Sequence, residues 1–453
     1  MNGKDTREGS PVYLLVICLA AATGGLLFGF DTAVISGAVG FFSAEFGLSA
    51  AMKGWAASSA LIGCMLGAML AGASSDRYGR KKVLLLSAVL FATSAVWCGL
   101  ARSVGELALA RIVAGIGIGI ASMLSPMYIA EVSPPRIRGR LVSLQQFAII
   151  SGILAAYFTN SQVLGLELTD AAKWRWMFAI GAFPAVVFFA LLLLVPESPR
   201  WLIKQGYIDR AMAVLTRLSG RTEADRELEA VQASLAQEEG TLAELLRPGL
   251  RKALCIGIAL AILQQVTGIN AILYYAPEIF KSAGSGAASA FNDTVWIGIF
   301  NLLFTLVAIL VIDRLGRKPL LLLGAAGMGV SLVLVGLAFQ QKASGLWLLA
   351  VILAYVSSFA ASLGPVVWVV MSEIYPTRIR GRAMSIATVL LWGSCYLVSQ
   401  TFPMLNKSLG NAATFWAYAS MCAVTIVFVA LWVPETRGKT LEEIEHMWMH
   451  GKS

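Results

Sequence analysis

The chain has 453 residues, of which 58% are hydrophobic and 13% are charged, and its mean hydropathy is +0.74. Soluble domains carry roughly a quarter charged residues, so this composition excludes an ordinary water-soluble domain and is typical of a chain spread across a bilayer. The formal net charge of +9 would suggest a nucleic-acid partner in a soluble protein, but in a membrane protein the positions of the charges matter more than their sum.

Twelve apolar segments are long enough to cross a membrane as helices, which requires about 20 mostly apolar residues each. They occupy residues 12–40, 54–74, 83–101, 105–130, 141–160, 175–195, 253–276, 294–312, 319–339, 346–371, 383–405 and 413–433. The first segment is too long for the apolar core of a signal peptide and contains Asp31, so we expect it to remain in the mature protein. The pattern predicts an all-α membrane protein with twelve transmembrane helices.

Basic residues in the loops predict the orientation of the chain. The loops after the even-numbered segments carry them in groups, among them Arg77, Arg80, Lys81, Arg136, Arg138, Arg140, Arg314, Arg317, Lys318, Arg378, Arg380 and Arg382. The odd-numbered loops carry single basic residues, such as Lys53 and Lys281. The positive-inside rule then places both termini in the cytoplasm, with the protein in the plasma or inner membrane, and no nucleic-acid partner is expected.

No cluster in the sequence predicts catalysis, a metal site or a cofactor. The six cysteines lie in apolar segments without Cys-x-x-Cys spacing, which is typical of small packing residues. His446 and His450 lie in the C-terminal tail, outside the apolar segments. The glycines of residues 115–119 lie inside a segment and indicate close helix packing. We therefore expect no enzyme, no metal and no cofactor, and a protein that functions as a monomer.

Three motifs recur in the same order with a spacing of about 240 residues. Asp-Arg-x-Gly-Arg occurs at residues 76–80 and 313–317, Glu…Arg-x-Arg-Gly-Arg at 131–140 and 373–382, and Pro-Glu-Ser/Thr at 196–198 and 434–436. The chain therefore reads as two six-helix units of the same orientation. Parallel repeats about an axis along the membrane normal predict a substrate site between the halves, near the midplane, reached by rocking one half against the other.

The repeat also predicts the domain limits. We expect an N-terminal six-helix bundle at residues 1–195 and a C-terminal six-helix bundle at residues 253–435. Residues 196–252 are polar and contain an apolar stripe at Leu228, Val231 and Leu235, which predicts short amphipathic cytoplasmic helices. Residues 436–453 contain a capping-box pattern at Thr440 and Glu443 and predict one more cytoplasmic helix.

The repeated loops place acids at one helix end and arginines at the start of the next. Ion pairs among them could close the cytoplasmic ends when the site faces outward, or could merely anchor the helix ends. The residues of this predicted cytoplasmic gate are Asp76, Arg77, Arg80, Glu131, Arg138, Arg140, Glu197, Arg200, Asp313, Arg314, Arg317, Glu373, Arg380, Arg382 and Glu435.

At these motifs the sequence resembles the sugar porter family of the major facilitator superfamily. Further matching stretches, which together span the chain from end to end, are residues 24–32 (Gly-Gly-Leu-Leu-Phe-Gly-Phe-Asp-Thr), 196–202, 264–270 (Gln-Gln-Val-Thr-Gly-Ile-Asn) and 364–368. The resemblance implies the major facilitator fold and a carrier that moves a monosaccharide, either a pentose or a hexose, or a polyol by alternating access.

Polar residues inside spans are costly and are usually functional. Amides both donate and accept hydrogen bonds, which suits sugar hydroxyl groups, and aromatic rings suit the apolar face of a sugar. The resemblance implies substrate contacts at Phe28, Gln146, Gln264, Gln265, Asn270, Tyr274, Asn301, Trp368 and Trp392. The alternatives are hydrogen bonding between helices for the amides and core packing for the aromatic residues. Gly268 and Pro277 are expected to loosen the seventh span.

Two positions depart from the pattern of the family's bacterial pentose symporter. Ile153 and Leu391 each stand where that relative has a glutamine, so two hydrogen-bonding groups are missing. The loss should alter or relax the recognition of hydroxyl groups, and it leaves the sugar open among pentoses, hexoses and inositols.

Asp31 lies about 20 residues into the first span, where desolvation disfavours its charged form and makes it a candidate proton carrier. Arg111, early in the fourth span, is the expected partner, and their association and separation would couple proton binding to sugar movement. A permanent structural pair in a passive uniporter is the alternative. A membrane sugar sensor that does not transport is a more remote alternative, because few residues follow Glu435 and sensors of the family tend to have long cytoplasmic tails.

Overall fold

The computed structural model describes residues 10–134, 137–236, 248–343, 345–375, 379–438 and 443–444, and its helices are numbered α1 to α17. The predicted C-terminal helix at residues 436–453 lies outside the described residues for most of its length, including Thr440, His446 and His450. Arg136 and Arg378 of the predicted basic loops also lie outside them.

Eleven of the described helical stretches are long and apolar enough to cross a membrane. In the first half they are formed by α1 (Pro11–Glu45), α2 (Ala50–Tyr78), α3 (Arg80–Leu100), α4 (Val104–Val132), α5 (Arg138–Leu164) and the pair α6 (Asp170–Ala179) and α7 (Ala182–Leu194). In the second half they are the pair α11 (Pro248–Val266) and α12 (Ile269–Ser282), α13 (Ala287–Leu315), α14 (Arg317–Gln340), the pair α15 (Leu346–Ala360) and α16 (Leu363–Ile374), and α17 (Arg380–Trp432).

The last of these helices contains two of the predicted spans. α17 has 53 residues, and Gly410 interrupts it with a φ of 82°. A straight helix of that length would extend about 80 Å, far more than the roughly 30 Å of hydrocarbon in a bilayer. The chain therefore turns back at Gly410, and the predicted all-α membrane fold with twelve crossings is confirmed.

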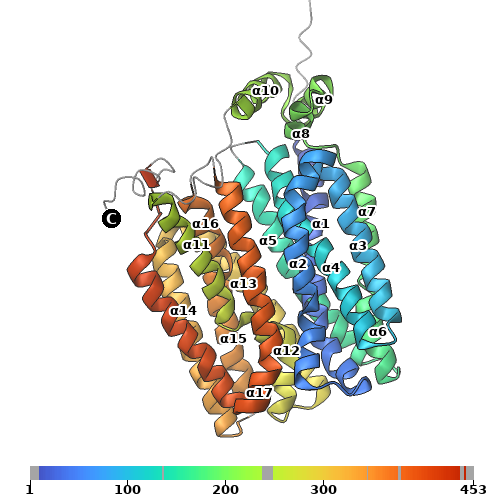
Figure 1. Ribbon diagram of the computed structural model, residues 1–453, viewed down its shortest axis with the longest axis vertical. Helices are drawn as coiled ribbons and strands as arrows, with labels where there is room; N and C mark the ends of the chain where they lie inside the picture. The colour runs from blue at the N-terminus through green and yellow to red at the C-terminus, as the bar shows by residue number, and fades with distance from the viewer. Residues whose placement is uncertain are drawn as a thin grey trace, which may run out of the picture.

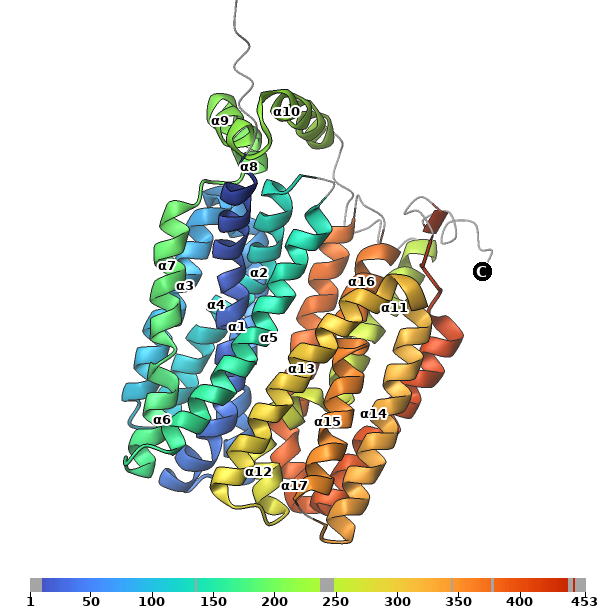
Figure 2. The same ribbon diagram turned by 180° about the vertical axis from the view of Figure 1, so that it is seen from behind.

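The two halves stand side by side with their long axes along the same direction (Figure 1). Helices α1–α7 form one half and α11–α17 the other, which is seen from behind in Figure 2. The halves meet where α2 packs against α17, α1 against α12 and α5 against α13. This arrangement matches the parallel repeat expected from the sequence motifs.

Three short helices cover one end of the first half, beyond the first residues of α1 (Figures 1 and 2). They are α8 (Pro199–Lys204), α9 (Ile208–Ser219) and α10 (Arg221–Ala236), and they share a small apolar core that includes Leu202, Leu215 and Ala224. They occupy the region where the sequence predicts amphipathic cytoplasmic helices, and the domain limits themselves stay a prediction.

Two spans of the second half are broken near their middles. Gly268 separates α11 from α12 with a φ of +93°, and the ring of Tyr418 lies where a Cβ at this glycine would stand. Ser362, with φ −140° and ψ −94°, separates α15 from α16. The sequence predicted the first break. Broken helices at mid-membrane expose backbone carbonyls that need partners inside the protein.

The cysteine prediction needs one correction. Cys18, Cys64, Cys98, Cys395 and Cys422 are buried as expected for packing residues, but Cys255 is exposed on α11. All six are free thiols. Apolar sequence around a residue does not distinguish a helix face that packs against protein from one that faces lipid, which explains the error.

Close helix packing holds α2 against α4. A Cβ added at Gly67 of α2 would stand 2.3 Å from the backbone oxygen of Ile116, and one added at Gly115 of α4 would stand 1.8 Å from that of Ala60. Small residues allow helix backbones to approach this closely in membranes. The glycines at residues 115–119 therefore pack helices, as the sequence analysis expected.

We predict that Gly67→Ala lowers the thermal transition of the purified protein, because the new methyl group forces the two helices apart. Overpacking of this kind costs about 1–3 kcal/mol. Gly72→Ala, on the same helix, is the matched control, since a Cβ there meets nothing within 4 Å and alanine favours the helix. Equal transition temperatures for the two variants, measured by scanning fluorimetry in detergent, would contradict this account.

Candidate functional site

Three of the predicted amides form a connected chain at the break of the seventh span. Gln264 donates from Nε2 to the carbonyl oxygens of Leu363 and Gly364, at 2.7 Å and 3.0 Å. Gln265 donates to Gln264 Oε1 at 3.2 Å, and Asn270 donates to Gln265 Oε1. Both glutamines are buried and Asn270 is half-buried. The break of one span is thus tied to the break of another.

This geometry bears on the two interpretations of the amides. The amide of Gln264 donates to carbonyls in the first turn of α16, as helix-to-helix hydrogen bonding requires. A glutamine amide has two donor hydrogens and two acceptor positions, and an asparagine the same, so the chain keeps capacity for further hydrogen bonds. Tyr274 lies further along α12 and is buried, and Asn301 is buried on α13.

Two of the predicted aromatic residues come together from opposite halves. Phe28 of α1 meets Trp392 of α17 edge to face, with ring centroids 5.4 Å apart. The Trp392 side chain is buried, and its Nε1 has no hydrogen-bond partner among the described residues. A buried indole N–H without a partner costs free energy, and an oxygen of a bound ligand would satisfy it. Trp368 is half-buried on α16.

The two departures from the family pattern are both apolar and buried. Leu391 directly precedes Trp392 on α17, and Ile153 lies on α5, where the backbone approaches Gly29 of α1. Each occupies its place without offering a hydrogen bond. The relaxed recognition of hydroxyl groups inferred from the sequence stays a prediction.

One polar residue near these positions was missed by the sequence analysis. Gln146 is half-buried on α5, but its neighbour Gln145 is buried, and neither atom of its amide has a partner among the described residues. The Gln145 side chain packs against Gly25 of α1. The signal was available, because Gln145 and Gln146 form an adjacent pair like Gln264 and Gln265.

The predicted charged pair is formed inside the first half. Arg111 of α4 donates from Nη1 to Asp31 Oδ2 at 3.1 Å and to the Asp31 carbonyl oxygen at 3.2 Å. The guanidinium also lies over the ring of Phe178, 5.5 Å from its centroid. Arg111 is almost fully buried, while the Asp31 side chain is 15% exposed. In this state the arginine compensates the carboxylate, and separating them would favour the protonated acid.

Four of the predicted gate residues form a compact cluster where α2 ends and α3 begins. Arg80 contacts Glu131 through Nε and Nη2, both at 3.1 Å, and Asp76 through Nη1 at 3.0 Å. The carboxylate of Glu197 accepts hydrogen bonds from the backbone N–H groups of Arg80 and Lys81. These N–H groups begin helix α3, where a negative charge is favoured.

The second half repeats the main contacts of this cluster. Arg317 contacts Glu373 through Nε at 3.2 Å and Nη2 at 2.8 Å, and contacts Asp313 at 3.1 Å. Glu435 accepts from the N–H groups of Arg317 and Lys318. The loop glycines before these arginines, Gly79 and Gly316, have φ of 96° and 93°, and a Cβ there would collide with the glutamate carboxylate.

The seven remaining predicted gate residues are all arginines. Arg77 stacks over Tyr78, Arg138 donates to the carbonyl of Ser133, and Arg380 donates to that of Tyr375. Arg140, Arg200 and Arg314 are exposed, and Arg382 is half-buried. Each ion pair of the two clusters joins helices of the same half. In this conformation the clusters anchor helix ends, and their role as a gate stays a prediction.

Comparison with known proteins places the chain in a family. Residues 17–448 match the family described as sugar (and other) transporter. The chain belongs to this sugar porter family. It is 46% identical to an arabinose-proton symporter of Bacillus subtilis, over 99% of this chain and 98% of the relative, and 42% identical to a D-xylose-proton symporter of Escherichia coli, over 96% of both.

Solved structures agree with the fold of a sugar porter. A partially occluded inward open structure of the xylose transporter of Escherichia coli matches with a TM-score of 0.86, at 40% identity, covering 95% of this chain and 100% of that one. The proton:xylose symporter bound to 6-bromo-6-deoxy-D-glucose matches with a TM-score of 0.81, at 42% identity, covering 96% and 99%. The chain is thus a multi-pass transporter of the major facilitator superfamily and not an enzyme.

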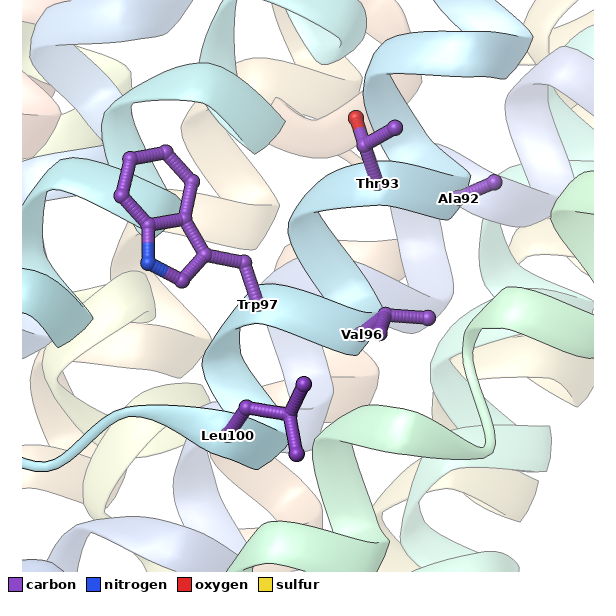
Figure 3. Close-up of a pocket in the computed structure, with 5 residues that line it drawn as sticks. All are labelled: Ala92, Thr93, Val96, Trp97 and Leu100. Carbon is purple, nitrogen blue, oxygen red and sulfur yellow. The ribbon is translucent and has the colours of Figure 1, made fainter.

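A surface hollow of this sugar porter lies away from all the predicted site residues. It measures about 470 Å³ and is lined by one face of α3, with Ala92, Thr93, Val96, Trp97 and Leu100 (Figure 3). The last three side chains are among the exposed apolar ones. An apolar face of a spanning helix that points outward is suited to lipid contact, so this hollow is not a candidate sugar site.

The two repeated glutamates differ in their electrostatics. Burial raises the pKa of Glu197 above its ordinary value of 4.5, despite the N–H groups of Ser198, Lys81 and Arg80 that favour the charged form. At Glu435 burial acts in the same direction, but the backbone N–H groups outweigh it and hold the pKa below 4.5. The pKa of the motif's glutamate is therefore shifted upward in the first half and downward in the second.

This difference predicts opposite effects of pH on stability. A raised folded pKa means that the fold binds the proton more tightly than the unfolded chain, so Glu197 contributes more stability as pH falls from 7 towards 4.5. The contribution of Glu435 is constant in that range and is lost below it. As pH falls from 7 to 5, the transition temperature of the wild type should rise relative to that of Glu197→Gln. Over the same range, the transition temperature of the wild type relative to that of Glu435→Gln should stay constant. Parallel curves would contradict the assignment.

Proposed function

We propose that this protein is a secondary active transporter that carries a monosaccharide together with a proton by alternating access. The observation that carries the proposal is the buried Asp31–Arg111 pair, which lies in the same membrane-embedded core as amides and an unsatisfied indole N–H suited to a sugar. The relatives named as arabinose- and xylose-proton symporters support it, because they match nearly the full length of this chain.

The sugar site is assigned to the region between the halves. Phe28 and Trp392 supply an apolar surface from the two sides, and Gln264, Gln265 and Asn270 supply donors and acceptors from one side. Polar groups combined with aromatic rings are what a polyhydroxylated ligand requires. Ile153 and Leu391 make part of this wall apolar, which alters or relaxes the recognition of hydroxyl groups and leaves the sugar open among pentoses and hexoses.

Coupling follows from the charge balance at Asp31. With Arg111 attached, the carboxylate is ionised and paired. A shift of α1 relative to α4 that withdraws Arg111 would leave a desolvated carboxylate, and taking up a proton is the less costly outcome. A proton bound from outside therefore enters the cycle with the sugar and is released when the arginine returns. The same pair kept permanently closed would give a passive uniporter, which is the alternative.

The orientation of the transporter follows from charge. The starts of α3 and α14, which carry the two clusters, lie at the same end of the molecule as the start of α1, and α9 and α10 lie beyond that end (Figure 1). The positive-inside rule assigns this end to the cytoplasm, with both termini, and the opposite end to the outside of the cell membrane. The end at Lys53 and Lys281 is called the outer end below.

Replacing Asp31 tests the coupling. Asp31→Asn should abolish sugar uptake driven by a pH gradient in proteoliposomes, because an amide cannot cycle a proton. Counterflow of labelled sugar, which requires no net proton movement, should persist within a few-fold of the wild type. If Asp31→Asn still concentrates sugar against a gradient, Asp31 is not the coupling residue, whereas a wild type that cannot concentrate sugar would favour the passive uniporter.

The indole N–H of Trp392 tests the sugar site. Trp392→Phe keeps an aromatic ring but removes the unpartnered donor, so the affinity for the transported sugar should fall about fivefold, the effect of one hydrogen bond. Competition by unlabelled arabinose and xylose in counterflow measures it. Trp97→Phe, on the lipid-facing hollow of α3, is the matched control and should leave the competition curves unchanged. Equal curves for both variants would remove Trp392 from the site.

A further inference from the structure

The outer ends of the two halves are joined by a charged pair. Lys53, near the start of α2, donates from Nζ to Glu278 Oε2 of α12 at 2.8 Å. The two residues are separated by 225 positions in the chain and belong to opposite halves. Among ion pairs whose two partners are both described, this pair alone connects the halves. The carboxylate also lies against α1, where a Cβ at Gly40 would stand 2.5 Å from Oε1.

Neutral contacts close the same end around the pair. Gln400 of α17 donates to the carbonyl of Ala51 at 3.0 Å and accepts from Ser58 at 3.2 Å. On the other side, Tyr157 of α5 donates to the carbonyl of Leu273 at 2.9 Å, and Ser161 donates to Asn292 at 3.0 Å. The described polar contacts between the halves thus gather at the outer end, as in an inward-facing conformation.

The surroundings of the pair suit an interaction that breaks and re-forms. The side chains of Lys53 and Glu278 are 21% and 28% exposed, so the pair is partly shielded from water but is not sealed. Lys281, one turn along α12, lies 3.6 Å from the other oxygen of Glu278. Because Lys281 moves with Glu278, the carboxylate keeps a compensating charge when Lys53 departs. A buried carboxylate stripped of all partners would be far more costly.

We propose that Lys53 and Glu278 form an electrostatic latch that holds the outer ends closed and sets the balance between inward-facing and outward-facing states. The inference rests on the proposed alternating-access function. Outward opening must separate α2 from α12 and therefore must break this pair, whereas the clusters at Arg80 and Arg317 can stay intact within their own halves. Removing the latch favours the open state by the free energy that the pair contributes to the closed one.

The opening of the outer end can be measured without sugar or a proton gradient. Ser58 is fully buried at the outer contact, so a cysteine placed there reacts with a membrane-impermeant maleimide only when the outer ends separate. The assay uses right-side-out vesicles and a background of Ser58→Cys with Cys255→Ser, which removes the exposed native thiol. The labelling rate is then proportional to the outward-open population.

Lys53→Met and Glu278→Gln should each raise the labelling rate about two- to fivefold, which is the range for a partly exposed ion pair. The matched control is Glu45→Gln. Glu45 pairs with Arg175 at 2.9 Å, with 29% and 26% exposure, at the same outer end but between α1 and α6 of one half. This control should leave the rate unchanged. A rate for Lys53→Met equal to that of Glu45→Gln would overturn the latch.

A double variant distinguishes the pair from two independent charges. If Lys53 and Glu278 act through each other, Lys53→Met with Glu278→Gln should label no faster than the faster single variant. Multiplicative rates would show independent effects and would also overturn the proposal. Counterflow by the unmodified protein in proteoliposomes is measured in parallel. Its absence would refute the proposed transport function, whereas a refuted latch leaves that counterflow intact.

Discussion

Hydrocarbon supplies no hydrogen bonds, and this constraint governs the whole structure. Every backbone group freed at a helix break must find a partner within the protein. At the break between α11 and α12 the carbonyl of Thr267 accepts from the hydroxyl of Tyr355 on α15. In return, Gln264 donates to the carbonyls of Leu363 and Gly364 in the first turn of α16. The two interruptions therefore support each other. A substrate site can then be built from their side chains, because the cost of the irregular backbone is already met.

Comparing the two repeated halves distinguishes the contacts that stabilise each half from the proposed transport sites, which occur only once. Both halves carry the same arginine cluster and the same glutamate over a helix start, so these features serve the fold of each unit. The sites that serve transport are not repeated. The buried ion pair belongs to α1 and α4 of the first half, and the amide chain belongs to α11 and α12 of the second. In the proposed mechanism the proton carrier therefore belongs to the first half and the amide chain to the second, while Phe28 and Trp392 contribute to the sugar site from both halves.

The sequence predicted more of the fold than of the contacts. Apolar length, loop charge and repeated motifs determine the spans and their order, because these signals are local or periodic. Pairing across the chain leaves no such signal. Lys53 was noted only as a single loop charge, and no motif marked Glu278 as its partner. The burial of Gln145 rather than Gln146 depends on helix rotation, which short motifs do not resolve. Cys255 was misjudged for the same reason.

In the proposed cycle, the two ion pairs between residues distant in sequence have different roles. Asp31 and Arg111 lie within one half, so rocking of the halves as rigid bodies does not by itself separate them. Lys53 and Glu278 lie across the halves, so rocking must separate them. The contact of Phe28 with Trp392 lies about one helical turn before Asp31 on α1 and also joins the two halves. Movement of α1 on outward opening would disturb that contact, the packing of Gly40 on Glu278 and the position of Asp31 together, since all three residues belong to this one helix. The first helix is therefore the element through which sugar binding, outer opening and proton exchange can be linked.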